Sequence, residues 1–318
     1  MMATADQIKM LIRSHYADND EHFNTAVLQL AAHEARKGHT ALAREIQEIV
    51  NAERNKRHNI LHLNKYNEFI DYQETDRRLS EMIISEELKV RIHRIKNEFR
   101  RQNELKKYNL QNRRKILLVG PPGTGKTMTA SVLATELGMP LGTIMMDKMV
   151  TKYMGETSSK LRTIFEAISE LQGVYLFDEF DAIGSARDKD NDVGEMRRVV
   201  NTFLQLLEQD NSGSLIIAAT NNISLLDKAL FRRFDDVIFY GNPDKVQIKS
   251  LIENKFSILE MELNLTKIIE SAQGLSHSEI SRACDDSIKE IILSDKKVIA
   301  ESLILAMIQE RKDIYTKG

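Results

Sequence analysis

The sequence of 318 residues is poor in cysteine and in long apolar runs. Its one cysteine, Cys284, excludes an intrachain disulfide and a metal cluster held by cysteines, and its helical surroundings predict a small buried side chain. The first ten residues, MMATADQIKM, lack the apolar core of a signal peptide, and no run approaches the ~18 apolar residues of a membrane span. We therefore expect a cytoplasmic protein in a reducing compartment, without a membrane span.

The sequence also has no strong excess of positive or negative residues, since its net charge is −2. Charged residues make up 29% of the chain and apolar residues 42%. This balance is ordinary for a globular protein. It gives no reason to expect binding to a nucleic-acid backbone or to an anionic membrane. A local basic run at 113–115 is interpreted as the solvated edge of a domain.

Apolar periodicity divides the chain into four segments. Residues 1–55 are predicted to form a three-helix bundle, whose core is marginal at this size, so we expect it to lean on a partner. A polar stretch over 51–75 contains five asparagines, and residues 56–84 are predicted to be a linker with limited helix. Residues 85–242 are predicted to be an α/β core, and residues 243–318 a separate helical lid.

The α/β segment alternates short apolar strands with helical patterns, which favours a parallel five-stranded sheet with helices on both faces. The predicted strands are 115–120, 142–147, 173–178, 214–220 and 236–241. The predicted helices between them are 126–137, 158–172 and 193–209.

A glycine-rich segment, GPPGTGKT, follows the first of these strands and opens a helix, the context that a phosphate-binding loop (P-loop) requires. Glycines let backbone N–H groups turn towards a phosphate, and the helix start adds partial positive charge. Lys126 would reach the β- and γ-phosphate oxygens, and Thr127 would give a hydroxyl to Mg²⁺. The segment predicts a P-loop NTPase that binds nucleotide through Gly120, Pro121, Pro122, Gly123, Thr124, Gly125, Lys126, Thr127 and Met128.

Acidic and amide side chains end two of the later strands. Asp178 is predicted to bind the nucleotide by holding Mg²⁺ together with Thr127, and Glu179 to polarise the attacking water as general base. Asn221 follows the neighbouring strand and is predicted to orient that water or to contact the γ-phosphate. The plainer alternatives are an acidic turn and a polar strand end.

Four motifs, GPPGTGKT, LFDEFDAI, AATN and ALFRRFD, resemble the AAA ATPases in their order and spacing. Within the AAA+ superfamily they are similar to the protein-remodelling branch that includes spastin, katanin and the endosomal-sorting ATPase. The resemblance implies ATP and Mg²⁺ bound between identical neighbours of a ring, usually a hexamer. It also implies that Arg232 and Arg233 reach the γ-phosphate of a neighbouring subunit as arginine fingers, with a surface basic pair as the alternative.

The segment TKYMGET, residues 151–157, resembles the family's pore loop. On that resemblance Tyr153 and Met154 would grip an extended polypeptide in the central channel, Gly155 would let the loop tilt, and Lys152 would flank the grip. The alternative is that Tyr153 packs under its own helix. Residues 185–195 are a weaker candidate for a second, charged channel loop.

Two stretches depart from the family pattern. The lid carries GLSHSEI at 274–280, where the family commonly has a glycine-alanine-aspartate run, and no arginine occupies its sensor position. Phe231 stands where the family usually has another arginine. His277, Ser278 and Glu279 therefore leave the local contacts of the lid open, although the resemblance still implies a lid over the adenine.

The leading hypothesis is an ATP hydrolase that threads protein substrates through the pore of a homo-oligomeric ring. One alternative is a nucleic-acid motor or loader, which the near-neutral net charge disfavours. Another is a nucleotide-gated adaptor that rarely hydrolyses ATP. Glu179 and the arginine pair argue against the adaptor, because a pure switch has less need of both. An adaptor or a separate protease could dock through residues 1–55. The chain itself has no H-E-x-x-H protease motif.

Overall fold

The computed structural model describes residues 68–149, 154–181, 192–222, 231–257, 264–294 and 300–316, and short pieces between 26 and 46. The chain forms two compact units, Met1–Lys65 and Tyr66–Gly318. In the first unit the described pieces are mostly helical, and Ala26, Ala31 and Ala43 are buried. Most of the predicted three-helix bundle lies outside the described residues, and the unit ends at Lys65 rather than at residue 55.

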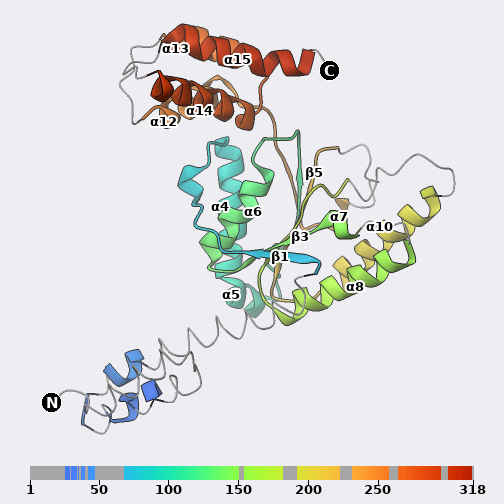
Figure 1. Ribbon diagram of the computed structural model, residues 1–318. Coiled ribbons are helices and arrows are strands. Elements are labelled where there is room, and N and C mark those ends of the chain that lie inside the picture. The colour runs from blue at the N-terminus through green and yellow to red at the C-terminus, as the bar shows by residue number, and fades with distance from the viewer. Residues whose placement is uncertain are drawn as a thin grey trace. The chain divides into compact units, whose positions relative to one another are not determined.

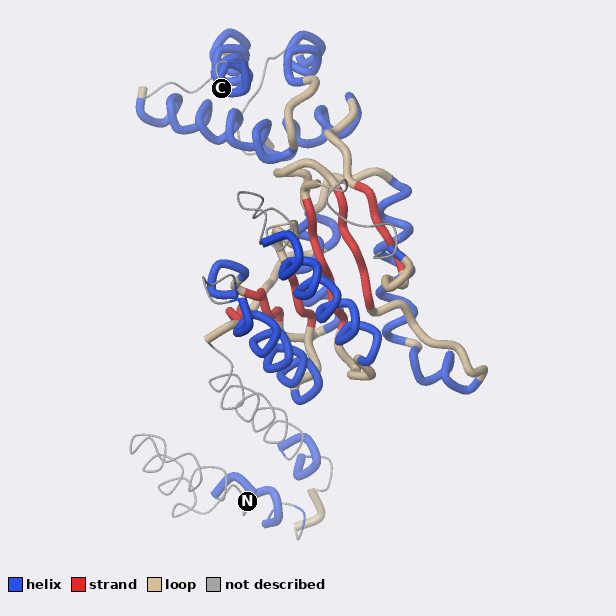
Figure 2. The backbone as a smooth tube through the Cα atoms, turned by 90° about the vertical axis from the view of Figure 1, so that its right-hand side faces the viewer, coloured by secondary structure: helices blue, strands red, loops and turns tan. Residues whose placement is uncertain are grey.

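A six-stranded sheet is the centre of the second unit, with the strand order β1-β3-β4-β5-β2-β6 (Figures 1 and 2). All of the pairings among β2 to β6 are parallel, so the five predicted parallel strands are confirmed. The strands are β1 (Ile70–Gln73), β2 (Lys115–Val119), β3 (Leu141–Ile144), β4 (Val174–Phe177), β5 (Leu215–Thr220) and β6 (Asp236–Phe239).

The sixth strand, β1, corrects the prediction of a linker over 56–84. It pairs antiparallel with β3, so that the buried Ile70 lies opposite Ile144 at the sheet edge. A 3₁₀ turn, Leu79–Glu81, and the buried Met82 and Ile84 then lead into the first long helix. Residues 70–84 therefore belong to the α/β core, because Ile70, Leu79, Met82 and Ile84 are buried in it.

Helices cover both faces of the sheet. They are α4 (Glu86–Arg100), α5 (Gln102–Lys107), α6 (Lys126–Leu137), α7 (Met146–Met149), α8 (Met154–Glu170) and α10 (Asp192–Gln209). Local chemistry sets their ends: the Ser85 hydroxyl caps α4 by accepting from the backbone N–H of Leu88 at 3.3 Å. Gly138, in the left-handed conformation, ends α6 as the sequence predicts.

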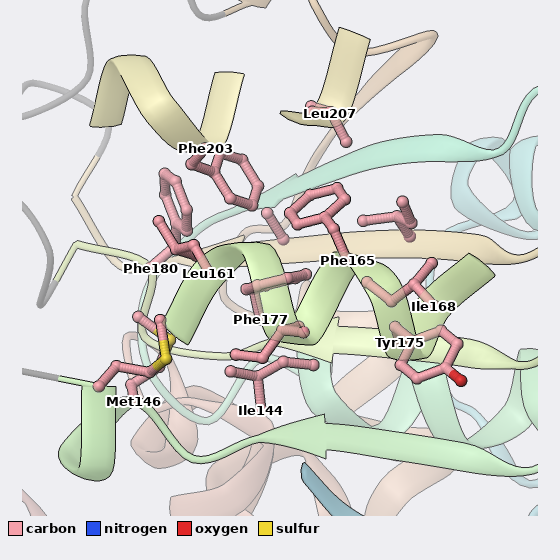
Figure 3. Close-up of a cluster of buried hydrophobic side chains, with 14 of the residues drawn as sticks. Ile144, Met146, Leu161, Phe165, Ile168, Tyr175, Phe177, Phe180, Phe203 and Leu207 are labelled. Carbon is pink, nitrogen blue, oxygen red and sulfur yellow. The ribbon is translucent and has the colours of Figure 1, made fainter. Parts of the chain in front are cut away.

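Alternate residues of each strand enter two different apolar layers. Ile116 and Leu118 of β2 face the layer under α4 and α6, which is built mainly of aliphatic side chains. Leu117 and Val119 face the layer under α8 and α10, where the rings of Phe165, Phe177, Phe180 and Phe203 gather (Figure 3). The Phe180 and Phe203 ring centroids are 4.6 Å apart, and those of Phe177 and Phe203 are 5.0 Å apart. This aromatic layer joins the end of β4 to both helices.

The predicted C-terminal helical lid is present, with an apolar core of its own. Cys284 is buried in that core, which raises the pKa of its thiol to about 12, and so it is the small buried side chain that the sequence predicts. Within the described residues, no helix is both long enough and apolar enough to cross a membrane. The lid helices are α12 (Lys245–Lys255), α13 (Leu265–Ala272), α14 (His277–Leu293) and α15 (Glu301–Thr316).

Candidate active site

The predicted phosphate-binding loop connects β2 to α6 at the carboxyl edge of the sheet. Gly125, the residue before α6, has a φ of +101°, a conformation that side-chain-bearing residues rarely adopt. This turn starts α6 at Lys126, so that the first, unpaired N–H groups of the helix face the loop. The local geometry is that of an anion-binding helix start.

Lys126 is almost completely buried at the start of α6. Its ammonium group donates to the carbonyl oxygens of Gly120 and Pro121 at 2.8 and 2.9 Å, and to Oδ1 of Asn221 at 2.8 Å. Burial lowers the pKa of Lys126, and the carboxylates of Asp178 and Asp181 oppose that shift. The structure thus brings Lys126 and Asn221 together, although they come from different strand ends.

Thr127 and Asp178, the predicted Mg²⁺ ligands, are in direct contact. The Thr127 hydroxyl donates to Oδ2 of Asp178 at 2.6 Å, while the other oxygen of Asp178 accepts from the backbone N–H of Glu179 at 2.9 Å. Hydroxyl and carboxylate oxygens are ligands that Mg²⁺ prefers, usually together with several waters. The two residues therefore fit a magnesium ion by their chemistry and their proximity.

Glu179 is exposed and has a φ of +49°, in the left-handed region. For a residue with a side chain this conformation costs roughly 1–2 kcal/mol. The flanking residues hold the turn in place: the N–H of the buried Phe180 donates to the Ala219 carbonyl at 2.8 Å. Asp181 accepts hydrogen bonds from the Thr220 hydroxyl and the Asn221 N–H, which ties the end of β4 to the end of β5.

A cavity of about 960 Å³ contains these groups. From the predicted site it is lined by residues 122–128, Asp178, Glu179 and Asn221. Gly120 and Pro121 contribute through their carbonyl groups on Lys126 instead. The segment before α4, with Arg77 and Glu81 to Ile84, forms a further wall that the sequence analysis did not indicate. The predicted lid forms another wall, with Leu251, Asn254, Lys255, His277, Ser278 and Ser281.

The lid meets the phosphate-binding loop directly at Gly123. The N–H of Ser278 in α14 donates to the Gly123 carbonyl at 3.0 Å. A Cβ placed on Gly123 would lie 2.6 Å from the Ser276 hydroxyl and 2.8 Å from the Ser278 Cβ, and Gly123 also has a φ of +74°. The absence of a side chain at this position is what allows the lid helix to pack on the loop.

The arginine pair lies outside this cavity. Arg233 forms an ion pair with Glu208 of α10. Arg232 is exposed, and within the described part of the chain it has no hydrogen bond or ion pair. Phe231, where the family usually has another arginine, packs instead against the aromatic layer.

The predicted pore loop is described only in part. Lys152 and Tyr153 lie outside the described residues, whereas Met154 and Gly155 form the first turn of α8. This corrects the predicted helix start at residue 158. Most of the second candidate loop, 185–195, is also outside the described residues, and its last four residues begin α10.

A parallel sheet with a glycine-rich phosphate loop after one strand and an acidic pair after another defines the class of P-loop nucleoside triphosphatases. Comparison with known proteins gives the family. Residues 116–242 match the family described as "ATPase family associated with various cellular activities (AAA)". An AAA family ATPase of Sinorhizobium fredii, y4kL, is 31% identical over 309 residues, which cover 94% of this chain and 93% of that relative.

Other relatives align over a smaller share of both chains. A proteasome-activating nucleotidase of Methanoregula boonei is 32% identical over 205 residues, 61% of this chain and 47% of the relative. An ATP-dependent zinc metalloprotease, FtsH 2, of Thermoanaerobacter is 31% identical over 193 residues, 58% of this chain and 38% of the relative. The chain belongs to the AAA ATPase family, and it is a nucleotide-binding ATP hydrolase.

Proposed function

We propose that this ATPase is a protein-remodelling motor that assembles into a ring, with a hexamer as the expected size, and threads polypeptide through the central pore. The observation that carries the proposal is the division of the site. The phosphate-binding residues line one cavity, whereas Arg232 is exposed outside it and has no partner among the described residues. The names of the relatives, a proteasome-activating nucleotidase and an ATP-dependent metalloprotease, support a protein substrate.

Within one subunit, the arrangement supports hydrolysis by the following division of roles. Lys126 would exchange its carbonyl partners for phosphate oxygens while remaining close to Asn221. A magnesium ion held by Thr127 and Asp178 would neutralise developing charge on the phosphates. Glu179, held next to Asp178 by its strained backbone, would accept a proton from the attacking water.

The remaining cation would come from a neighbouring subunit. A head-to-tail interface that closes on itself brings a surface of one subunit against a different surface of the next. Arg232, exposed and without a partner among the described residues, is the group best able to reach a neighbour's γ-phosphate. Its planar, permanently charged guanidinium suits phosphate oxygens.

Movement at the nucleotide would reach the pore loop through the aromatic layer. Phe177 and Phe180 flank the acidic pair, and the Phe177 ring lies 6.0 Å from that of Phe165 in α8. The proposed gripping residues are Lys152, Tyr153, Met154 and Gly155, and the last two form the first turn of α8. A small shift of α8 would carry the movement to the pore loop, because packed cores transmit displacement.

The decisive experiment changes Tyr153, the proposed gripping side chain. Tyr153→Ala should reduce ATP-dependent unfolding of a fluorescent protein carrying an unstructured tail by at least about tenfold, and reduce the ATPase rate far less. Tyr153→Phe is the matched control, since it keeps the ring and should retain unfolding. Unchanged unfolding by Tyr153→Ala would contradict the gripping role, and stimulation by DNA with none by polypeptide would favour a nucleic-acid motor.

We further propose that an adaptor or a separate protease docks through residues 1–55. The alignment with the metalloprotease spans only 38% of that relative, so its protease activity is not carried over to this chain. Glu179→Gln, which should hold ATP without hydrolysing it, gives the test. Cross-linking in that variant should capture a protein partner in the full chain and not in a chain lacking residues 1–55.

A further inference from the structure

Tyr240, the residue after β6, brings a hydroxyl group into the mainly aliphatic layer under α4 and α6. Its oxygen lies 2.6 Å from the hydroxyl oxygen of Thr129 in α6, and both residues are buried. In apolar surroundings a hydroxyl that loses its partner costs free energy, so a buried pair of this kind depends on both members. Neither residue belongs to the phosphate-binding or acidic motifs.

The direction of these hydrogen bonds follows from the number of protons. A threonine hydroxyl has one proton to donate and can accept as well. Thr129 donates its proton to the Gly125 carbonyl at 3.0 Å, so the proton shared by the two hydroxyls comes from Tyr240. Burial raises the pKa of Tyr240 to about 12, although the hydrogen bond to Thr129 opposes this shift, so the proton stays in place at neutral pH. The bonds therefore run from Tyr240 through Thr129 to Gly125.

This chain of hydrogen bonds ends on the peptide group that opens α6. The Gly125 carbonyl also accepts from the backbone N–H of Thr129 at 3.0 Å, so two bonds fix its direction. In a planar trans peptide the N–H points away from the carbonyl, so fixing the Gly125 carbonyl also fixes the N–H of Lys126. That N–H has no partner within the helix and is one of the groups that would bind a phosphate oxygen.

Tyr240 also contacts the first residue of the phosphate-binding loop. A Cβ placed on Gly120 would collide with the Tyr240 carbonyl oxygen and would lie 2.8 Å from the Tyr240 Cβ. The N–H of Tyr240 donates to the Val119 carbonyl at 2.7 Å, which fixes its backbone beside the loop. Tyr240 thus holds both ends of the loop, Gly120 by direct packing and Gly125 through Thr129.

We propose that Tyr240 is a positioning residue for nucleotide binding, which acts through Thr129 to hold the Gly125–Lys126 peptide in the direction that binds phosphate. It touches no part of the nucleotide itself. The inference rests on the nucleotide site and is independent of ring assembly and polypeptide threading.

The first test removes the Tyr240 hydroxyl and keeps the ring. Tyr240→Phe should lower the affinities for ADP and for tripolyphosphate alike, roughly two- to twelvefold, because the lost hydrogen bond acts on the phosphate side. Calorimetry with Mg²⁺ present measures both affinities. Tyr175→Phe is the matched control, since it makes the same change at a buried tyrosine of β4 whose hydroxyl donates to the Leu171 carbonyl at 2.8 Å. It should lower the melting temperature by a similar amount and leave both affinities as they are.

A double variant, Thr129→Val with Tyr240→Phe, separates positioning from stability. It leaves no buried hydroxyl of the pair without a partner, so the melting temperature should return towards that of the wild type. The Gly125 carbonyl would still lack the bond from Thr129, so both affinities should stay at least as low as in Tyr240→Phe.

Wild-type affinities in Tyr240→Phe would overturn the proposal. So would an equal loss in Tyr175→Phe, or affinities that recover together with the melting temperature in the double variant, since either result shows a role in stability alone. Failure of the wild-type chain to bind ADP or tripolyphosphate would instead contradict the nucleotide site.

Discussion

The phosphate side of the site and the arginine pair are the two charged regions that the sequence assigns to one reaction, and they differ in how completely they are paired. Lys126 and Asn221 bind each other, and Thr127 binds Asp178, all within one cavity. The arginines lie outside that cavity. The phosphate side is organised within a single subunit. The arginine pair includes an exposed cation, Arg232, that has no acidic partner among the described residues.

The two arginines also differ from each other in their contacts. Arg233 forms an ion pair with Glu208, while Arg232 has no partner among the residues that the structure describes. Adjacent arginines that look interchangeable in the sequence therefore have different surroundings. Because their local contacts differ, we propose Arg232 rather than Arg233 as the arginine finger.

The largest expected effect follows from removing the unpaired cation. Arg232→Ala should lower the ATPase rate by about 10³-fold or more, because the finger would be missing from the neighbour's transition state. Lys126→Ala should be inactive too, since it loses the phosphate-binding ammonium. A mixture of the two inactive variants should recover activity at about a quarter of the sites, where an intact Lys126 meets an intact neighbouring Arg232.

That recovery separates a shared site from one that is complete within a subunit. If the site were complete, mixing would restore nothing. Sedimentation with ATP present should show the same assembly for both variants. A chain that remains monomeric with ATP, yet hydrolyses it at the normal rate, would contradict the division between the two regions.

The next effect tests the phosphate side alone. Glu179→Gln should reduce hydrolysis by about 10²-fold or more while ATP still binds, because the amide cannot accept the proton from water. Asp181→Asn, on the next residue but one, is a useful control since Asp181 links the strand ends and is not assigned the proton. Equal single-turnover rates for Glu179→Gln and the wild type would remove the base from the proposed mechanism.

Asn221→Ala should have a smaller effect, about tenfold on the ATPase rate, since it removes one hydrogen bond to a charged group. The ATPase rate should fall because Lys126 loses the hydrogen bond that it donates to Asn221. Burial already lowers the pKa of Lys126, so its charged form depends on such contacts. The exposed neighbour Asn222 gives the matched variant, Asn222→Ala, which should hydrolyse normally. Similar rates for the two variants would show that the contact with Asn221 is incidental.

The smallest effect belongs to the paired arginine. Arg233→Ala should change the ATPase rate less than about threefold and lower the unfolding free energy by no more than about 1 kcal/mol, because its ion pair with Glu208 is largely exposed. Glu208→Ala should behave alike in both measurements. An ATPase loss in Arg233→Ala as large as that in Arg232→Ala would mean that the two arginines act together.

Local patterns were enough to predict the five parallel strands of the sheet. The apolar runs at β2, β4 and β5 are buried along almost their whole length, so they are recognisable without knowledge of their neighbours. Gly138 ends α6 where the sequence places the stop, because a helix end of this kind depends on one residue's backbone freedom.

Features that depend on distant partners were missed. β1 has four residues, and only pairing with β3, far along the chain, makes it a strand. The cavity walls at Met82 to Ile84 and at His277 depend on how the lid and the segment before α4 meet, which no local pattern reports. The unequal pairing of Arg232 and Arg233 depends on where α10 places Glu208.

Gly123 serves both the phosphate loop and the packing of the lid. Its carbonyl holds Ser278 of the lid, its positive φ shapes the phosphate loop, and any Cβ would collide with Ser276. A residue with a side chain would therefore push the lid away from the phosphate loop, even without a bound nucleotide. Only glycine, which has no Cβ, fits between the phosphate loop and the lid at this position.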